Sequence, residues 1–430
     1  MPRMQKIHAS PGAHECRRGW RGWMAAISMG MLVLILSLVL DGCGGGEVAG
    51  VGSGGSGTAS GTVSGFGSVI VDGVEYADTR ASVQRPDGAG ALQSSAVKLG
   101  QRVRLVYDSS NNAQSIEVLS QLVGPVTALP DNNGWMQVLG QWVRVVNNTS
   151  DPTRSAPTVL DGCSGVAAIA SGDTMEVFGS WVWDGSKSAT VLVATRMERL
   201  ATAPALVQLG GVVQGLSGSS FRLNASNGTL VQASSVPTDL ADGAVVQVWA
   251  TQSAWAAASS SVPLQATLVL RSETRAADLA TGQALRLGGL ASQFDASART
   301  LVVQGMTVQL AAGLVVDEAA LARGEFVSLQ VQRVGDKLVA SSVEVRSGSA
   351  PNDDLGGKTL LIGNTSGINW NASNVQFSLR GVQVQATAAV IDTSCKSVAL
   401  TTQISVRVEG GVQTPGQPVT ATRVQCSPAT

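Results

Sequence analysis

The sequence predicts an all-β chain of about five tandem small barrels, and three observations carry this prediction. Glycine occurs 50 times and charged residues make up only 14% of the chain, while 44% of the residues are hydrophobic. Small and β-branched residues with frequent turns suit pleated strands rather than long amphipathic helices. Apolar Ile404, Val406 and Val408 alternate with polar Ser405 and Arg407, as in a strand with one buried face. A weak pattern also recurs every ~60–85 residues, the length of one small barrel.

The first residues predict an export signal. Lys6, Arg17, Arg18 and Arg21 make a positively charged leader, and the uncharged apolar run Met24–Leu40 follows it. A run of this length lies between the core of a signal peptide and a membrane-spanning helix. An uncleaved transmembrane anchor is therefore an alternative to a cleaved signal.

The residues after this run favour cleavage. Leu40-Asp41-Gly42-Cys43 resembles the lipobox of bacterial lipoproteins, although Asp41 departs from its preference for a small uncharged residue. The resemblance implies that residues 1–42 are removed as a signal peptide. It also implies that Cys43 carries acyl chains such as palmitate, which makes the lipid bilayer a partner of this chain.

A flexible tether is expected after the cysteine, at residues 43–58. The segment Gly44–Gly61 reads GGGEVAGVGSGGSGTASG, and such a Gly/Ser stretch cannot bury apolar surface. Its r.m.s. reach is roughly 20–25 Å. Gly44, rather than Asp, follows the lipidated cysteine, which resembles lipoproteins sorted outward. The expected location is the bacterial cell envelope, at the outer membrane, facing the periplasm or the cell surface.

Five later segments, modules 1 to 5, share one pattern. Each opens with an apolar-Gly pair and a short strand, turns through one or two more strands, and closes with a late strand and a final strand. The openings are ASGTV at 59–63, LVGPV at 122–126, LGGVV at 209–213, LGGL at 287–290 and LIGN at 361–364. The predicted module boundaries are 59–120, 121–202, 203–275, 283–348 and 357–430.

The strand count favours an OB-like barrel. Each module has five or so strands, and a short helical stretch, Glu318–Arg323, precedes the fourth strand of module 4. An immunoglobulin-like sandwich, the alternative, needs about seven strands and ~100 residues per unit. The late strands are expected at 101–107, 174–183, 244–249, 325–331 and 403–408. The final strands are expected at 113–119, 192–197, 266–271, 339–346 and 419–425.

This layout resembles a bacterial family known as domain of unknown function 5666. The residues that carry the resemblance are Cys43-Gly44-Gly45-Gly46 with its Gly/Ser tail, the segment Ala59–Tyr76 (ASGTVSGFGSVIVDGVEY), and the repeated opening and closing strands. The match covers most of residues 59–346 and is poorer in module 5. The resemblance implies tandem OB-like modules on a lipoprotein, and it implies no catalytic residue.

The absent residues argue against an enzyme. Both histidines, His8 and His14, lie in the leader, which removes histidine-based nucleophile and metal sites from the exported part. There is no CxxC pair and no GxxxxGK[ST] phosphate loop, so no cofactor and no metal are expected. Two converging carboxylates would suffice for a glycosidase. The adjacent pair Asp353-Asp354 is better explained as a solvated linker.

Two Asx-rich segments offer oxygen ligands for calcium but suit hairpin turns better. They are Asp108 with Asn111 and Asn112, and Asp131 with Asn132 and Asn133.

Three cysteines remain in the exported part besides Cys43. Cys395 and Cys426 both lie in module 5, and a disulfide between them would stabilise the module by roughly 3 kcal/mol in an oxidising periplasm. Cys163 is then left over as a buried, free or intermolecular thiol. It has no histidine partner, so a catalytic role is not expected.

Tryptophans give the one hint of a binding site. Module 2 contains Trp135, Trp142, Trp181 and Trp183, and aromatic side chains on an OB-like face stack on ligands. Core packing is the favoured alternative, because Trp181 and Trp183 share one strand parity with Met175 and Val177 if Gly179 causes no bulge. Without surrounding Lys or Arg, a glycan or a protein is a better ligand than nucleic acid.

Two functions follow. The first is a non-catalytic cell-envelope lipoprotein whose modules bind or scaffold a protein or polysaccharide partner, with no nucleic acid. The alternative is a carboxylate-dependent hydrolase of envelope glycan. A net charge of −1 supplies no basic field for nucleic acid.

Overall fold

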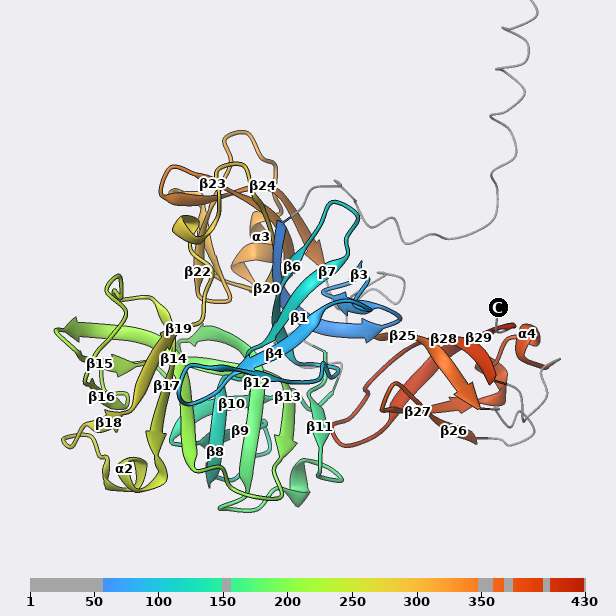
Figure 1. Cartoon of the computed structure of the whole chain (residues 1–430), viewed down its shortest axis with the longest axis horizontal. Coiled ribbons are helices and arrows are strands. Elements are labelled where there is room, and N and C mark those ends of the chain that lie inside the picture. Colours follow the sequence, from blue (N-terminus) through green and yellow to red (C-terminus); the bar gives the residue numbers. More distant parts are fainter. Residues whose placement is uncertain (1–56, 149–155, 347–358, 367–373, 397–402, 429–430) are drawn as a thin grey trace, which may run out of the picture. The chain divides into compact units, whose positions relative to one another are not determined.

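The computed structural model describes residues 57–148, 156–346, 359–366, 374–396 and 403–428. The described part is all-β, with only short helices (Figure 1). No helix within these ranges is long and apolar enough to span a membrane.

Module 4 shows the barrel in its simplest form. Its first strand pairs antiparallel with the second and the fourth, the fifth pairs antiparallel with the fourth, and the third pairs parallel with the fifth. This 1-2-3-5-4-1 order closes a five-stranded barrel of the OB type, with one short helix between the third and fourth strands. The elements are β20 Ala284–Asp295, β21 Thr300–Val303, β22 Met306–Leu310, α3 Glu318–Ala322, β23 Phe326–Val334 and β24 Lys337–Arg346.

Module 2 closes in the same order. Its third strand, β10, pairs parallel with its fifth, β13, and the short β11 adds to the same strand. The elements are β8 Leu122–Ala128, β9 Trp135–Val138, β10 Gln141–Val145, β11 Val159–Asp161, the 3-10 helix η1 Val166–Ala168, β12 Thr174–Asp184 and β13 Ala189–Arg199.

Modules 1 and 3 are variants in which one strand is broken into two pieces. In module 1 the third strand is split between β3 and β4, and in module 3 the fifth is split between β18 and β19. Module 1 contains β1 Gly57–Phe66, β2 Val69–Val71, β3 Val74–Tyr76, β4 Ser82–Pro86, β5 Leu92–Ser94, β6 Arg102–Tyr107 and β7 Ala113–Val118. Module 3 contains β14 Leu206–Ser217, β15 Ser220–Leu223, β16 Leu230–Ala233, β17 Val245–Thr251, α2 Gln252–Ala257, β18 Leu264–Ala266 and β19 Leu268–Arg271, and η2 Ala276–Asp278 follows it.

Module 5 repeats four of these pairings, β25–β28, β28–β29, β29–β27 and β27–β26. Its elements are β25 Thr359–Ser366, β26 Asn374–Leu379, β27 Val382–Thr387, η3 Ala388–Val390, α4 Thr393–Lys396, β28 Gln403–Gly411 and β29 Val419–Pro428.

The predicted fold class is confirmed, and so are the late and final strands. The helix expected at 318–323 is α3. Two details differ from the expectation. β1 begins at Gly57, inside the predicted tether, and the final strand of module 3 is interrupted at Thr267, whose N–H donates to the Trp249 carbonyl at 2.8 Å.

The apolar-Gly openings have a packing reason. A two-residue turn with two positive φ values joins the second and third strands of four modules, as at Leu139 (56°) and Gly140 (75°). The first turn residue lies against a glycine of the first strand, so a Cβ built at Gly124 would be 2.5 Å from Cδ2 of Leu139. The same contact of turn residue with first-strand glycine occurs for Asp72 with Gly61, Asn224 with Gly211, Gln304 with Gly289 and Arg380 with Gly363.

Gly179 allows β12 to cross a bulge in β13. The strand register shifts between Phe178 and Gly179, and a Cβ at Gly179 would lie 2.9 Å from the carbonyl carbon of Val193 and 3.0 Å from Cα of Ala194. The extra residue lies in β13, so β12 keeps the expected parity from Met175 to Trp181. Trp181 lies in the core at 2% exposed, whereas Trp183, with the same parity, is 45% exposed near the end of the strand.

We expect Gly179→Ala to lower the free energy of unfolding by about 1–3 kcal/mol, because the added methyl meets backbone that cannot rotate away. Urea unfolding followed by tryptophan fluorescence measures the change. Gly185→Ala is the matched control, since a Cβ there has nothing within 4 Å. Equal stability of the two variants would contradict the packing account.

Candidate functional site

The outer face of β9 and β10 gathers two tryptophans. Met136, Val138, Val143 and Val145 point into the barrel and are buried, and the residues that alternate with them point outward. The register places Trp135 opposite Arg144 and Gln137 opposite Trp142. Cross-strand neighbours on one face lie close enough for aromatic and long side chains to touch. We call Trp135, Gln137, Trp142 and Arg144, together with Lys187, the aromatic face.

The two indoles of the aromatic face meet edge to face. The ring centroids of Trp135 and Trp142 lie 6.3 Å apart with an interplanar angle of 84°. Nζ of Lys187 lies 4.8 Å from the Trp135 centroid and 4.1 Å from that of Trp142. The guanidinium of Arg144 lies 5.3 Å from the Trp135 centroid and is largely buried, at 7% exposed for the residue. Each contact of this kind contributes about 0.5–2 kcal/mol.

Two Asx turns hold the loops beside the aromatic face. Oδ1 of Asp131 accepts hydrogen bonds from the backbone N–H groups of Asn133 (2.8 Å) and Trp135 (2.9 Å). Oδ1 of Asp184 accepts from the Ser186 hydroxyl (2.6 Å) and from the Lys187 N–H (3.0 Å). These hydrogen bonds fix the start of β9. They also fix the position of the Lys187 backbone in the hairpin between β12 and β13. In OB barrels, this strand pair and these two loops are where ligands bind.

The Asx-rich segments weighed as calcium sites act as turns. Oδ1 of Asp108 accepts from the backbone N–H groups of Ser110 (2.8 Å) and Asn112 (2.9 Å), and its neighbours Asn111 and Asn112 complete the hairpin. Asp131 does the same beside Asn132 and Asn133. Within the described ranges, no group of three His, Cys, Asp or Glu residues is placed to hold a metal ion.

The four predicted tryptophans therefore separate into three groups. Trp135 and Trp142 come together on the aromatic face. Trp181 is a core residue whose Nε1–H donates to Oε1 of Gln121 at 2.8 Å, as the core interpretation predicts. Trp183 shares the strand parity of Trp181 but is exposed, so the core interpretation is wrong for it.

The prediction that no Lys or Arg surrounds these tryptophans is also wrong. Arg144 lies two residues after Trp142 on one strand, and this alternation was visible in the sequence QWVRV. Lys187 had no such signal, because only the folded hairpin brings it over the rings.

The shared two-residue turn allows module 2 to be compared with modules 4 and 5 residue by residue, and of these three only module 2 carries aromatic residues at these positions. The positions of Trp135, Gln137, Trp142 and Arg144 correspond to Thr300, Val302, Thr307 and Gln309 in module 4 and to Gln376, Ser378, Gln383 and Gln385 in module 5.

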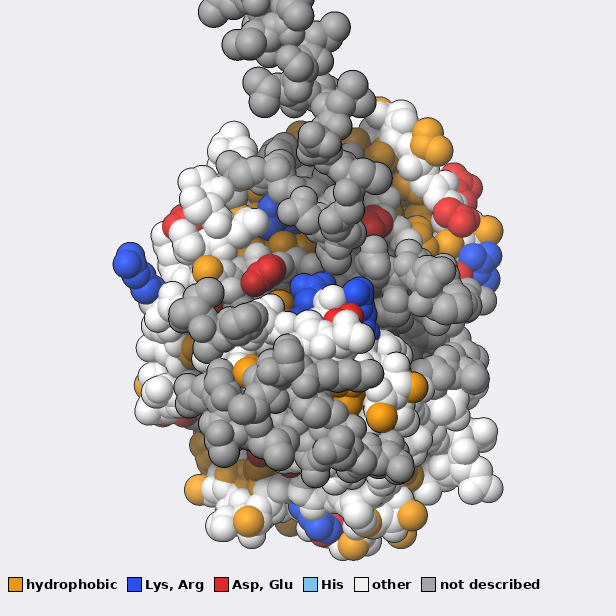
Figure 2. Space-filling view, turned by 90° about the vertical axis from the view of Figure 1, so that its right-hand side faces the viewer, with side chains coloured by type: hydrophobic (Ala, Val, Ile, Leu, Met, Phe, Trp, Pro, Cys, Tyr) orange, Lys and Arg blue, Asp and Glu red, His pale blue; other side chains and the backbone are white. Residues whose placement is uncertain are grey.

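Figure 2 shows one face of the molecule, on which basic and acidic side chains lie among uncharged ones. Burial raises the pKa of the Glu273 carboxyl, and the neighbouring Arg271 partly offsets this rise. Glu273 also accepts a hydrogen bond from the Val245 N–H at 3.1 Å, so its partners here are a cation and a backbone amide.

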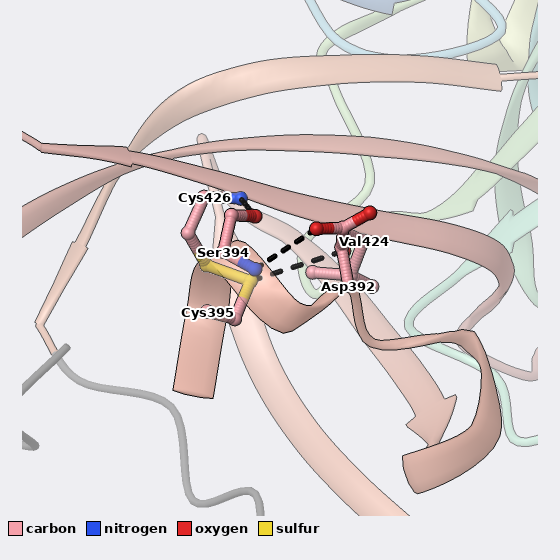
Figure 3. Close-up of a disulfide and its surroundings, with 5 residues drawn as sticks. All are labelled: Asp392, Ser394, Cys395, Val424 and Cys426. Carbon is pink, nitrogen blue, oxygen red and sulfur yellow. Dashed lines mark hydrogen bonds between the residues drawn. A yellow bond between two sulfur atoms is a disulfide. The ribbon is translucent and has the colours of Figure 1, made fainter. Parts of the chain in front are cut away.

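The predicted disulfide joins Cys395 and Cys426 (Figure 3). Cys395 lies on α4 and is fully buried, and Cys426 lies on β29. The N–H of Cys426 donates to the Ser394 hydroxyl at 3.2 Å, and the Ser394 N–H donates to Oδ1 of Asp392 at 2.9 Å. The bond ties the short helix to the last strand.

Cys163 is a free, buried thiol whose pKa is raised by burial. A raised pKa disfavours the reactive thiolate. Three other predicted features lie outside the described residues, namely the apolar run Met24–Leu40, the lipidation site Cys43 and the pair Asp353-Asp354.

No protein-family model matches the sequence, and no curated protein matches it. Among solved structures, a chain described as drosophila Unr CSD456 aligns at 12% identity with a TM-score of 0.15. That alignment covers 51% of the present chain and 97% of the other.

Proposed function

We propose that this chain is a non-catalytic lipoprotein of the cell envelope that binds a polysaccharide through the aromatic face of module 2. Cys43 carries the lipid anchor and residues 44–56 act as the tether. The other modules serve as a scaffold. The observation that carries the binding proposal is the perpendicular pair Trp135 and Trp142 on an outer barrel face.

The physical reason lies in the surface that these rings offer. Two half-buried indoles at 84° present apolar planes on which the C–H face of a sugar ring packs. Arg144 lies over the Trp135 ring and the Asx turn of Asp131 fixes the Trp135 backbone, so little side-chain entropy is lost on binding. A protein partner would use the same rings, but the face is one strand pair wide, which suits a single sugar chain better.

The described residues offer less support for a hydrolase. A glycosidase needs two carboxyl groups facing each other across a cleft. The carboxyl whose pKa burial raises, Glu273, is tied to Arg271 and to the amide of Val245 instead. We therefore propose binding without catalysis.

Trp142→Ala is expected to weaken glycan binding by about 2 kcal/mol or more, roughly 30-fold in Kd, because a ring that packs on the ligand is removed. An array of neutral and acidic oligosaccharides probed with the full exported chain measures it. Thr307→Ala, at the corresponding position of module 4, is the matched control and should leave binding unchanged. Failure of every sugar to bind, or equal binding by Trp142→Ala and the parent, would contradict the proposal.

A further inference from the structure

We infer that the sugar polymer recognised by the aromatic face is anionic, and that its carboxylate or phosphate groups pair with the ammonium of Lys187. This inference rests on the proposed function and adds the charge of the ligand. Its starting point is the position of Lys187 over both indoles, 4.1 and 4.8 Å from their centroids.

The ammonium of Lys187 is held over the two indole rings, which carry no net charge. Among the residues that the structure describes, no carboxylate forms an ion pair with Lys187. The indole rings attract the cation through their quadrupole and carry no net charge. An ammonium has three N–H donors and no acceptor, so donors that point away from the rings are open to an anion.

The nearby carboxylates are engaged with their own loops. Oδ1 of Asp184 accepts hydrogen bonds from Ser186 and from the backbone of Lys187, and Oδ1 of Asp131 accepts two backbone N–H groups. Both acids therefore shape the loops that flank the rings. Asp184 in particular positions the backbone of Lys187 rather than its charge.

The cations of the aromatic face have different tasks. Arg144 is largely buried and supports Trp135, whereas Lys187 extends from an exposed hairpin. An anionic group on a stacked sugar meets Lys187 without displacing it from the indoles. A neutral sugar on the same ring faces competes with the ammonium for them and gains no ion pair in return.

A sugar polymer fits better than a nucleic acid. One half-buried lysine on a chain of net charge −1 provides no basic track for a continuous phosphate backbone. Two perpendicular rings also do not form a row of platforms for successive bases.

The test is a fluorescence titration of the exported chain with four probes of equal length: hexamannuronate, phosphorylated maltohexaose, neutral maltohexaose and the oligonucleotide dT6. The two anionic sugars tell carboxylate from phosphate. Titrations are repeated with Lys187→Met and with Lys337→Met, an exposed lysine in the corresponding hairpin of module 4.

The expected result is that at least one anionic sugar binds about 10-fold or more tightly than maltohexaose, as one charge-assisted hydrogen bond provides. Lys187→Met should remove that preference, and Lys337→Met should keep it. If maltohexaose binds as tightly as the anionic sugars and Trp142→Ala still abolishes binding, the ligand is neutral and only this inference fails. If dT6 binds best, the sugar assignment is overturned. If no probe binds, the proposed function fails with it.

Discussion

Replacing Cys43 with serine is expected to remove all acyl mass from the protein and to leave residues 1–42 uncleaved. The lipobox-like Leu40-Asp41-Gly42-Cys43 places a thiol at the one position where lipidation precedes cleavage, and serine has no thiol to alkylate. Each buried methylene contributes about 0.8 kcal/mol, and stable anchoring takes more than one chain. Without acyl chains, membrane attachment of the variant depends on the uncleaved apolar run Met24–Leu40.

Intact mass of membrane-extracted protein measures this effect. The parent should start at residue 43 and carry diacylglycerol and an acyl chain, whereas the variant should carry neither and should retain residues 1–42. Cys163→Ser is the control, since Cys163 is a free buried thiol and its loss should leave the lipid mass in place. A parent chain that retains residues 1–42 without lipid would show instead that Met24–Leu40 is a transmembrane anchor.

Removing the Cys395–Cys426 disulfide is expected to lower the stability of module 5 by about 3–4 kcal/mol. The two cysteines are 31 residues apart in sequence, and the chain-entropy account gives this magnitude for a loop of that length. The loop encloses β28, which pairs with both β25 and β29. A loss of this size is a large fraction of the stability of a small domain.

Hydrogen exchange in Cys395→Ala/Cys426→Ala is the measurement, because it reports on module 5 separately from the other barrels. Amides of β28 and β29 should lose protection, and those of β23 and β24 in module 4 should not. Cys163→Ala again serves as the control for removing a buried sulfur. Unchanged exchange in β28 and β29 would show that strand pairing alone holds the module.

Local periodicity was enough to predict the strands of this protein. Alternation such as Ile404, Val406 and Val408 specifies which residues enter a barrel, because a strand has a period of two whatever surrounds it. The Cys395–Cys426 pair was also predictable, since both residues lie in one small module. The recurring apolar-Gly openings signalled repeats, although their cause, a turn residue lying on the glycine, appears only in the fold.

The burial of the tryptophans was not predictable from parity. Trp181 and Trp183 have the same parity on β12, but the strand continues beyond the barrel, so one is in the core and the other is exposed. The parity of a residue decides which face of the strand its side chain is on. It does not tell how far along the strand the packed core extends.

The sequence by itself determined the fold class, the repeats and the residue types available for binding. Only the tertiary structure decided which of these residues lie in contact with one another. The two-residue turn at Leu139 and Gly140 sets the register that brings Trp135 and Trp142 together, and the hairpin after Asp184 adds Lys187 from some 45 residues further along the chain. Contacts between residues so far apart in the sequence depend on closure of the barrel. A local sequence pattern does not predict that closure.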